Sequence, residues 1–334
     1  MKKNILFCSV GRRGTLLQNV RKSMNGCGKI VATDNSPVAP ALYFADSIYQ
    51  VPRITDEQYT NKILEICKKE NINALTTLID PEIEIMANHY EQYVKNGILP
   101  LCPNKVSAHI CFDKYEMFKH FQKKGVRTVL TYKDLNILKK ALKDSQISFP
   151  VFMKPISGSG SVGAHKVDTL EQLENDWNKG DFTYIIQELM TEGDCDADVY
   201  VDTISHKPVA AFSKKKIETR IGGASKTISF KDPKLFSFIE EVCNALELNG
   251  PCDMDFFIKD GEYYLSEINP RFGGAYLHAY GAGVDFIQLI LNNIEGKTNK
   301  STIGNYEEDI LMMMYDAVVI RKKSELMEGD FSLL

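Results

Sequence analysis

The chain has 334 residues, of which 44% are hydrophobic and 25% are charged, and its formal net charge is −4. This composition is typical of a globular protein, and the small negative charge gives no electrostatic reason to expect nucleic acid or an anionic membrane as the main partner. No apolar stretch approaches membrane-spanning length. The eight cysteines form no C-x-x-C pair and no Cys/His cluster, which predicts reduced thiols and a cytoplasmic location.

Strands and helices alternate along residues 1–110, and the chain is expected to enter its first strand directly rather than through a signal peptide. Strands are predicted at residues 4–10, 29–33 and 74–79, and helices at residues 15–24, 57–70 and from Pro81 onward. This alternation predicts an α/β domain built on a parallel sheet. Ligands of such sheets lie beyond the carboxyl ends of the strands, and the polar residues predicted there are Ser9 to Arg13, Asp34, Asp80 and Glu82.

Residues 111–334 are predicted to form an α+β domain in two parts, the first of which is a small lid subdomain at about 126–188. A helical pattern over residues 107–124 precedes it, and the elements predicted within it are a helix at 135–143 and strands at 151–154, 164–167 and 184–187. In the second part, the predicted elements are antiparallel strands at 198–202 and 208–213, a basic loop at 214–226, helices at 233–247 and 284–295, a hairpin at 253–271 and a strand at 310–319.

The hairpin is the most informative segment of the sequence. Apolar runs at residues 255–258 and 263–268 flank Asp260-Gly261, a pair that is typical of tight turns between strands. If the loop has three residues, Asp255 lies opposite Glu267 on one face of the hairpin, whereas a two-residue turn places the two carboxylates on opposite faces. The register therefore decides whether these carboxylates form one site.

The three-residue alternative predicts a magnesium site. Asn269 lies two residues after Glu267 and shares its face in either register. Together with Asp255 these side chains supply oxygen ligands that suit Mg²⁺, and phosphates would complete the coordination. Arg271 follows them in the sequence and would clamp a phosphate or an oxyanion.

A glycine-rich segment, Lys154-Pro-Ile-Ser-Gly158-Ser-Gly160-Ser-Val-Gly163, lies between two predicted strands. It matches G-x-G-x-x-G, but the dinucleotide-binding version of that motif requires a helix directly after the loop. Strands on both sides instead favour a flap whose backbone N–H groups close over a triphosphate. Lys154 ends the preceding strand, where its charge would meet the α- or β-phosphate.

These motifs resemble the ATP-grasp superfamily in order and rough spacing, over nearly the whole chain. The residues that carry the resemblance are Asp113-Lys114, the strand and loop at Lys154, Gln187-Glu188-Leu-Met with Gly193, and Asp255 followed by Glu267-Ile-Asn269-Pro-Arg271. The chain is most similar to the carboxylate–amine ligases that look like the carbamoyl-phosphate synthase large subunit, including the pyrrolysine-biosynthesis ligase. Its Val10-Gly-Arg-Arg13 and Leu78-Ile-Asp80-Pro-Glu82 resemble the N-terminal domain of that group.

The resemblance implies an N-terminal pre-ATP-grasp domain at residues 1–110 and a two-part ATP-grasp domain at 111–334, with ATP between the two parts. The residues it implies for binding ATP are Lys114, Lys154, Ser157, Gly158, Ser159, Gly160, Ser161, Gly163, Gln187, Glu188, Leu189, Met190 and Asp196. Asp194 also fits the position of the ribose-binding acid, because Gly193 to Asp198 is one residue shorter than the common pattern; Asp196 ranks first. The implied Mg²⁺ ligands are Asp255, Glu267 and Asn269, with two ions expected and Mn²⁺ able to substitute.

Basic residues between the predicted strands and the hairpin suggest a substrate side. Three consecutive lysines, residues 214–216, have the pattern of a solvated face, whereas Arg220 beside Gly222-Gly223 is better placed to meet an acyl phosphate or a carboxylate. Arg271 and Lys154 are the other two expected catalytic residues. Further candidates are Lys226 in the same loop, Arg12 and Arg13 for a substrate carboxylate, and His278 and Tyr280 for the acceptor pocket or for packing.

The function that follows from the resemblance is ATP-dependent ligation of a small-molecule carboxylate to an amine through an acyl phosphate, with a homodimer as the family tendency. Two alternatives remain from the sequence. A nicotinamide-dependent oxidoreductase would use the N-terminal sheet, with Asp34 following Gly11 at the spacing of a ribose-binding acid. A non-catalytic nucleotide sensor would keep the ATP site without turnover.

Overall fold

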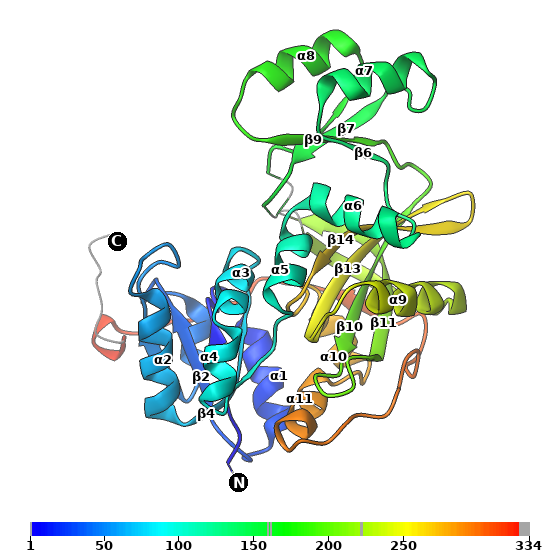
Figure 1. The fold of residues 1–334 in the computed structure, drawn as a ribbon. Helices are drawn as coiled ribbons and strands as arrows, with labels where there is room; N and C mark the ends of the chain where they lie inside the picture. The colour runs from blue at the N-terminus through cyan, green and yellow to red at the C-terminus, as the bar shows by residue number, and fades with distance from the viewer. Residues whose placement is uncertain (1, 159, 161, 221–222, 327–334) are drawn as a thin grey trace.

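The computed structural model describes residues 2–158, 160, 162–220 and 223–326. A parallel α/β domain, a small lid and a large antiparallel sheet follow one another along the chain, and the lid stands apart above the other two (Figure 1). This order confirms the predicted fold class. No helix in these described ranges is long and apolar enough to cross a membrane.

The N-terminal sheet is parallel and, within the described residues, has the strand order β3-β2-β1-β4-β5. Its strands are β1 (Asn4–Cys8), β2 (Ile30–Asp34), β3 (Ser47–Gln50), β4 (Ile72–Thr77) and β5 (Leu99–Pro100). Its helices are α1 (Gly14–Met24), the 3-10 helix η1 (Pro40–Phe44), α2 (Tyr59–Glu70), α3 (Pro81–Asn88) and α4 (Tyr90–Lys95). Every residue of β1 is buried, because alternate side chains pack into two different hydrophobic clusters on the two faces of the sheet.

Two carboxylates at the carboxyl ends of these strands hold turns in place. Asp34 accepts a hydrogen bond from the backbone N–H of Gly11 at 2.8 Å, so it stabilises the turn that follows β1. The nicotinamide alternative assigned Asp34 to the ribose, but in this structure the Asp34 carboxylate is engaged by the backbone of the turn, which disfavours that alternative. Glu82 is buried and accepts hydrogen bonds from the hydroxyls of Tyr59, Ser9 and Thr77, the last two at 2.6 Å.

The lid is a small antiparallel sheet with the order β6-β9-β7-β8 among the described residues, and α7 and α8 cover the face that points away from the rest of the molecule (Figure 1). Its elements are β6 (Thr131–Tyr132), α7 (Leu135–Lys143), β7 (Val151–Pro155), β8 (His165–Val167), α8 (Leu170–Asn178) and β9 (Tyr184–Glu188). Before it, the predicted helical stretch is divided into α5 (Lys105–Phe112) and α6 (Lys114–Lys124). The division falls at Asp113, whose side chain caps α6 by accepting from the backbone N–H groups of Tyr115 and Glu116.

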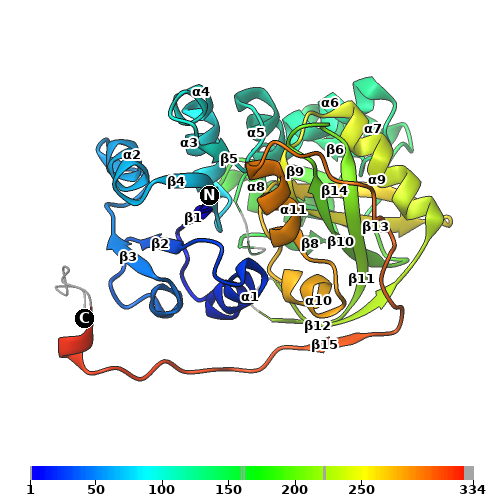
Figure 2. The ribbon, with the colours of Figure 1, turned by 90° about the horizontal axis from the view of Figure 1, so that it is seen from below.

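The large sheet has the order β14-β13-β10-β11-β12-β15 in the part of the chain that the structure describes. Its strands are β10 (Asp194–Val201), β11 (Pro208–Arg220), β12 (Gly223–Phe230), β13 (Gly250–Lys259), β14 (Glu262–Asn269) and β15 (Leu311–Met313). The accompanying helices are α9 (Pro233–Ala245), α10 (Tyr276–Gly281), α11 (Phe286–Ile294) and the 3-10 helix η2 (Lys323–Glu325). After β15 the chain runs extended along one side of the molecule toward the N-terminal domain (Figure 2).

Two sequence predictions about this sheet are wrong. The basic segment predicted as a loop instead forms the end of β11 and the start of β12. A lysine can be accommodated inside this sheet because a carboxylate balances its charge: Lys214 Nζ lies 2.7 Å from Asp198 Oδ2. The predicted strand at residues 310–319 shrinks to β15, because only Leu311–Met313 pair with β12. The apolar side chains of β10 and β13 pack against α9 on one face of the sheet. The acidic residues that alternate with them along both strands therefore lie on the other face.

Candidate active site

The hairpin has the two-residue turn of one alternative and the Asp255–Glu267 pairing of the other. Lys259 pairs with Glu262, so the turn has two residues, Asp260 and Gly261, and both have the positive φ of a tight hairpin turn (53° and 69°). The predicted three-residue loop is therefore wrong. The register then shifts between the pairs Phe256–Leu265 and Asp255–Glu267, which leaves Ser266 as an extra residue.

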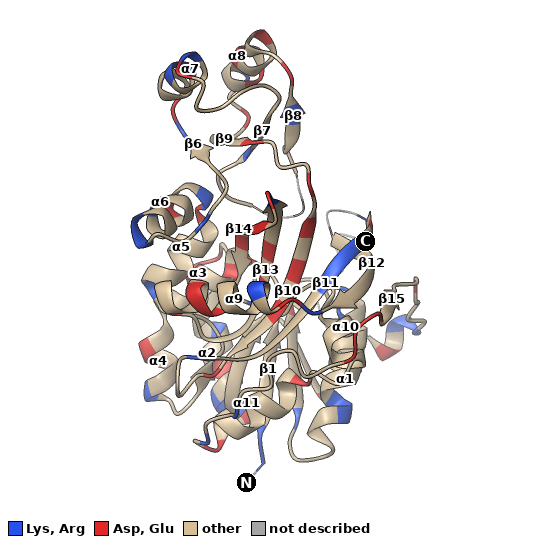
Figure 3. Ribbon diagram, turned by 90° about the vertical axis from the view of Figure 1, so that its right-hand side faces the viewer, with Lys and Arg blue, Asp and Glu red and all other residues tan. Residues whose placement is uncertain are grey.

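This bulge restores the pairing on which the metal site depends. With Ser266 unpaired, Asp255 lies opposite Glu267, and Asp253 lies opposite Asn269. The same rows continue onto β10, where Asp196 pairs with Asp255 and Asp198 with Asp253. Acidic residues therefore form bands across neighbouring strands of one face, beside the basic end of β11 (Figure 3). The two carboxylates do share a face, as the three-residue alternative predicted.

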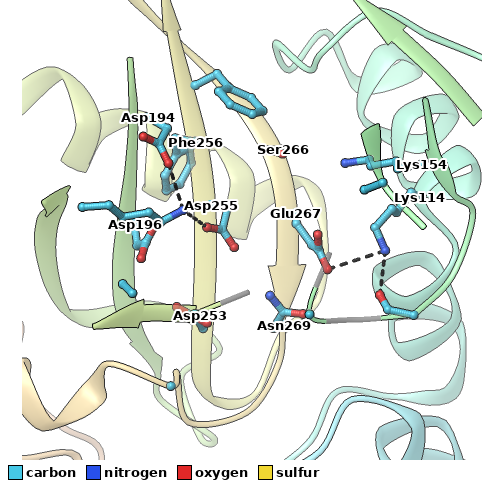
Figure 4. A pocket seen from close by; sticks show the side chains of 18 of the residues that line it. Lys114, Lys154, Asp194, Asp196, Asp253, Asp255, Phe256, Ser266, Glu267 and Asn269 are labelled. Carbon is cyan, nitrogen blue, oxygen red and sulfur yellow. Dashed lines mark hydrogen bonds and ion pairs between the residues drawn. The ribbon is translucent and has the colours of Figure 1, made fainter. Parts of the chain in front are cut away.

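A cavity of about 350 Å³ lies between this face and the lid. The predicted site residues that line it are Lys114, Lys154, Ser157, Gly158, Gly160, Asp196, Asp255, Glu267, Asn269 and Arg271. Asp194, Asp253 and Lys216 line it as well, and the first two are drawn with their neighbours in Figure 4. Strand alternation could have indicated Asp253, because it lies two residues before Asp255 on the same strand.

The structure does not bring every candidate to this cavity. Glu188 and Leu189 line a different cavity beside Lys259, whose Nζ lies 2.6 Å from Glu188 Oε2. Gln187 is buried and donates to Thr131 Oγ1 at 2.8 Å. Gly163, Met190 and Arg220 are also absent from the described lining, and Arg220 is exposed and paired with Asp316. Ser159, Ser161 and Gly222 lie outside the described residues.

Two lysines approach the hairpin from the lid side. Lys114, the first residue of α6, donates from Nζ to the carbonyl of Gly158 at 3.0 Å, and the same Nζ lies 3.6 Å from Glu267 Oε1 (Figure 4). Lys154 in β7 is buried beside it. Burial lowers the pKa of Lys154 to about 8, and the charge of Lys114 adds to this effect against the opposing attraction of Glu267. Two neighbouring ammonium groups repel each other, so binding of an anion between Lys114 and Lys154 would be strongly favoured.

The depressed pKa of Lys154 predicts a pH dependence of nucleotide binding. Phosphate stabilises the ammonium form, so ADP should bind best below pH 8, where Lys154 is already protonated. Above that pH each binding event must take up a proton, and affinity should fall with a slope approaching about tenfold per pH unit. Calorimetry in buffers of different ionisation enthalpy would measure both the slope and the proton uptake. Lys154→Arg should remove both, and an equal slope in that variant would contradict the assignment.

Lys216 lies among three carboxylates on the sheet side of the cavity. Its Nζ is 2.7 Å from Asp196 Oδ1, 2.9 Å from Asp255 Oδ1 and 3.0 Å from Asp194 Oδ2. Burial would lower the pKa of Lys216, but Asp255 and Asp196 outweigh it and raise the pKa. Burial, together with the charge of Asp255, raises the pKa of Asp253 to about 6. The ammonium of Lys216 thus offsets part of a dense negative charge.

Arg271 connects the hairpin to the N-terminal domain. Its Nε lies 2.7 Å from Asp80 Oδ1 and its Nη2 lies 3.2 Å from Asp80 Oδ2. Its Nη1 lies 3.2 Å from Asp253 Oδ2, so one guanidinium spans two carboxylates from different domains. Arg13 reinforces this connection by donating from Nη2 to the carbonyl of Gly273 at 2.6 Å. The Asp80 motif and the Arg271 motif are therefore parts of one site.

Gly273 has a steric reason to be glycine, which gives a prediction. A Cβ at this position would lie 2.5 Å from Asp198 Oδ1 and 2.9 Å from Asp253 Oδ1, both of which belong to packed side chains. We expect Gly273→Ala to lower the free energy of unfolding by about 1–3 kcal/mol, the usual cost of overpacking. Gly274→Ala is the matched control, since its Cβ would meet nothing within 4 Å. Urea denaturation measures both, and equal stability of the two variants would contradict the packing argument.

Two of the remaining substrate-side candidates, His278 and Tyr280, have structural partners. His278 is buried, and its Nδ1 lies 2.7 Å from Thr227 Oγ1 and its Nε2 3.0 Å from the carbonyl of Ile310. Burial lowers the pKa of His278 to about 4, so the imidazole is neutral at pH 7. Tyr280 contacts Ser23, and Arg12 is exposed. These contacts favour the packing alternative for His278 and Tyr280.

The oxygen donors of the hairpin fit a magnesium ion whose other ligands come from a nucleotide. Asp255 and Glu267 are register partners, and Asn269 follows on the same face. Throughout the described ranges, no group of three or more His, Cys, Asp or Glu side chains is arranged to hold a metal ion by itself. Two carboxylates and one amide therefore leave coordination positions that phosphate oxygens and water would fill, which is how nucleotide-dependent proteins bind Mg²⁺.

Two family models match the chain: "PylC-like, N-terminal domain" over residues 5–101 and "ATP-grasp domain" over residues 111–275. The formate-dependent phosphoribosylglycinamide formyltransferase of Flavobacterium psychrophilum is 23% identical over 257 residues, which are 72% of this chain and 64% of that protein. The carbamoyl phosphate synthase large chain of Thermoanaerobacter is 24% identical over 81% of this chain and 26% of its own length. The chain thus spans less than two thirds of either relative.

Solved structures show the same fold at lower identity. The N5-carboxyaminoimidazole synthetase of Staphylococcus aureus, complexed with ADP, has a TM-score of 0.73 and 15% identity, covering 90% of this chain and 80% of its own. The L-amino acid ligase of Bacillus licheniformis has a TM-score of 0.66 and 18% identity, covering 90% and 79%. Fold and motifs together define a nucleotide-binding protein. The chain belongs to the ATP-grasp superfamily and carries the PylC-like N-terminal domain, which confirms the predicted resemblance.

Proposed function

We propose that this protein is an ATP-dependent ligase that joins a small-molecule carboxylate to an amine. The observation that carries the proposal is the cavity in which Asp255 and Glu267 are register partners, while Lys114 from α6 and Lys154 from the lid approach from the other side. Opposed carboxylates and buried lysines around one space suit a metal-bound triphosphate, because each oxygen donor and each ammonium then has a partner of opposite charge. ATP is the expected nucleotide and Mg²⁺ the expected metal, with two ions and substitution by Mn²⁺ as part of the proposal.

The reaction proceeds in two transfers. A carboxylate oxygen of the first substrate attacks the γ-phosphorus, the bond to the β-phosphate oxygen breaks, and ADP leaves. The amine nitrogen of the second substrate then attacks the acyl carbon, inorganic phosphate leaves, and one proton is released. Metal binding at the hairpin would supply charge neutralisation for the transferring group. No covalent enzyme intermediate is required.

The side chains of this chain have defined roles in that scheme. Lys114 and Lys154 bind phosphates, and Gly158 and Gly160 bring backbone N–H groups of the loop toward them. Arg271 is proposed to stabilise the transferring phosphoryl group, because it is a cation that lines the same cavity as the metal ligands. Asp196 is proposed for the ribose, with Asp194 as the alternative. Closure of the lid over the cavity would exclude water from the acyl phosphate.

Some predicted site residues lie outside the described cavity lining. The ATP-binding role of residues 187–190 and the acyl-phosphate role of Arg220 stay predictions, since none of these residues lines the described cavity. A homodimer also stays a proposal; one similar solved structure, from Hydrogenobacter thermophilus, is a biotin carboxylase domain dimer with MgADP (TM-score 0.74, 18% identity, 93% of this chain and 73% of that one).

The proposal is tested by a matrix of carboxylates and amines, including pairs of amino acids, assayed for phosphate release and for a condensed product by mass spectrometry. We expect ADP and phosphate to form only when both substrates are present, together with a product whose mass is the sum of both minus water. Tight ATP binding without turnover across the matrix would instead favour the non-catalytic sensor.

A further inference from the structure

Lys216 was expected on a solvated face, and the structure places it in the lining of the proposed nucleotide site. Its side chain is 21% exposed, and its Nζ lies within 3.0 Å of carboxylate oxygens of Asp194, Asp196 and Asp255. The neighbouring Lys215 has a different environment, with its Nζ 5.1 Å from the centre of the Phe230 ring. Because successive side chains of a strand point to opposite faces, Lys216 points toward the carboxylates of the site while Lys215 points to the other face of β11.

Each proposed metal carboxylate already has a lysine partner in this structure. Asp255 pairs with Lys216 at 2.9 Å from the sheet side, and Glu267 is 3.6 Å from Lys114 on the lid side. Each of the two carboxylates therefore has an ammonium partner, and all four residues line the cavity. Figure 4 shows Lys114 beside Glu267 and Asp255 on the neighbouring strand. Lys114 is a proposed phosphate-binding residue, and Lys216 is its counterpart across the gap.

We propose that Lys216 is a third phosphate-binding lysine, which Asp194, Asp196 and Asp255 hold until a divalent cation on Asp255 weakens that hold. The inference rests on the proposed function and deepens it. A cation on Asp255 replaces the ammonium as the partner of that carboxylate and repels it at short range. The long, flexible stem of lysine lets the ammonium keep Asp194 or Asp196 as a partner while it turns toward the phosphates of the nucleotide.

Two opposite effects on affinity follow. Without nucleotide, Lys216 competes with the metal for Asp255, so the metal alone binds weakly. With nucleotide, the released ammonium gains a phosphate, so metal and nucleotide favour each other's binding. A residue that merely stabilised the fold would not change the two affinities in opposite directions.

The test uses Lys216→Met, which keeps an unbranched side chain one atom shorter and removes the charge. Binding of Mn²⁺ alone, measured from the electron paramagnetic resonance signal of free Mn²⁺, should become about 10-fold tighter, the equivalent of one hydrogen bond to a charged group. Binding of ADP with Mg²⁺, measured by calorimetry, should become about 10-fold weaker for the same reason. Lys215→Met should change neither affinity, and Lys216→Arg should restore both toward the wild-type values.

A second measurement uses the unmodified protein and does not depend on a variant that folds. The rate of Lys216 acetylation, followed by mass spectrometry, should rise when Mn²⁺ alone is added and fall below the starting rate when ADP is added as well. Unchanged Mn²⁺ affinity in Lys216→Met, or an acetylation rate that does not respond to metal, would overturn the inference while leaving the ligase proposal standing. Wild-type protein that binds neither Mn²⁺ nor ADP would overturn both.

Discussion

Replacing Glu267 with glutamine is expected to lower the rate of ADP formation by about 10³-fold while the protein remains folded. Glutamine keeps the size of the side chain and one oxygen, but it removes the negative charge that faces Asp255 across the gap. It also removes the ion partner of Lys114, whose Nζ is 3.6 Å from Glu267 Oε1. The triphosphate would then lose both metal affinity and correct alignment for in-line transfer.

Steady-state ADP release at saturating Mg²⁺ measures this effect, with circular dichroism to verify folding. Glu262→Gln is the matched control because Glu262 lies on the same strand but forms half-exposed ion pairs with Arg127 and Lys234. Pairs of this kind contribute about 0–1 kcal/mol, so the control should retain nearly full activity. Undiminished turnover in Glu267→Gln would refute the metal assignment.

Replacing Arg271 with lysine is expected to lower kcat on the order of 10²-fold while ADP affinity changes little. The guanidinium of Arg271 contacts Asp80 through Nε and Nη2 and Asp253 through Nη1. A lysine ammonium cannot span both carboxylates in fixed geometry, so the charge would no longer be held where the γ-phosphoryl group passes. Lysine is chosen over alanine because loss of the charge would leave two largely buried carboxylates unpaired and destabilise the fold.

The distribution of the effect between kcat and the ADP dissociation constant tests this role. ADP lacks the transferring group, so its affinity should remain within about two-fold of wild type if Arg271 acts only on the γ-phosphoryl group. Arg127→Lys is the control, since Arg127 also pairs with a carboxylate in the same half of the chain but lies outside the described cavity lining. Equal losses in ADP affinity and in kcat would show that Arg271 is structural rather than catalytic.

Sequence reasoning succeeded where a function depends on residue type and local spacing. The order and rough spacing of Lys114, Lys154, Asp255, Glu267 and Arg271 resembled the ATP-grasp superfamily closely enough to predict it, and the family match over residues 111–275 confirms that prediction. Strands β1, β2 and β4 of the parallel domain were also predictable, because their apolar runs match burial on both faces of the sheet, whereas β3 and β5 were not predicted.

Sequence reasoning failed where a function depends on pairing between strands. The spacing around Asp260-Gly261 could not reveal that a two-residue turn is followed by a bulge at Ser266, since one extra residue costs little locally and changes which face every later side chain occupies. It could not separate Lys216 from a surface lysine either, because three of its partners come from β10 and β13.

The amino-acid sequence by itself thus determined which chemical groups this protein can bring to a reaction and the order in which the chain supplies them. Only the tertiary structure decided that Asp80, far away in the N-terminal domain, holds Arg271, and that Lys216 lies inside the site. The physical reason is that composition and spacing are properties of neighbouring residues, whereas burial and charge pairing arise from segments that meet only when the sheets have formed.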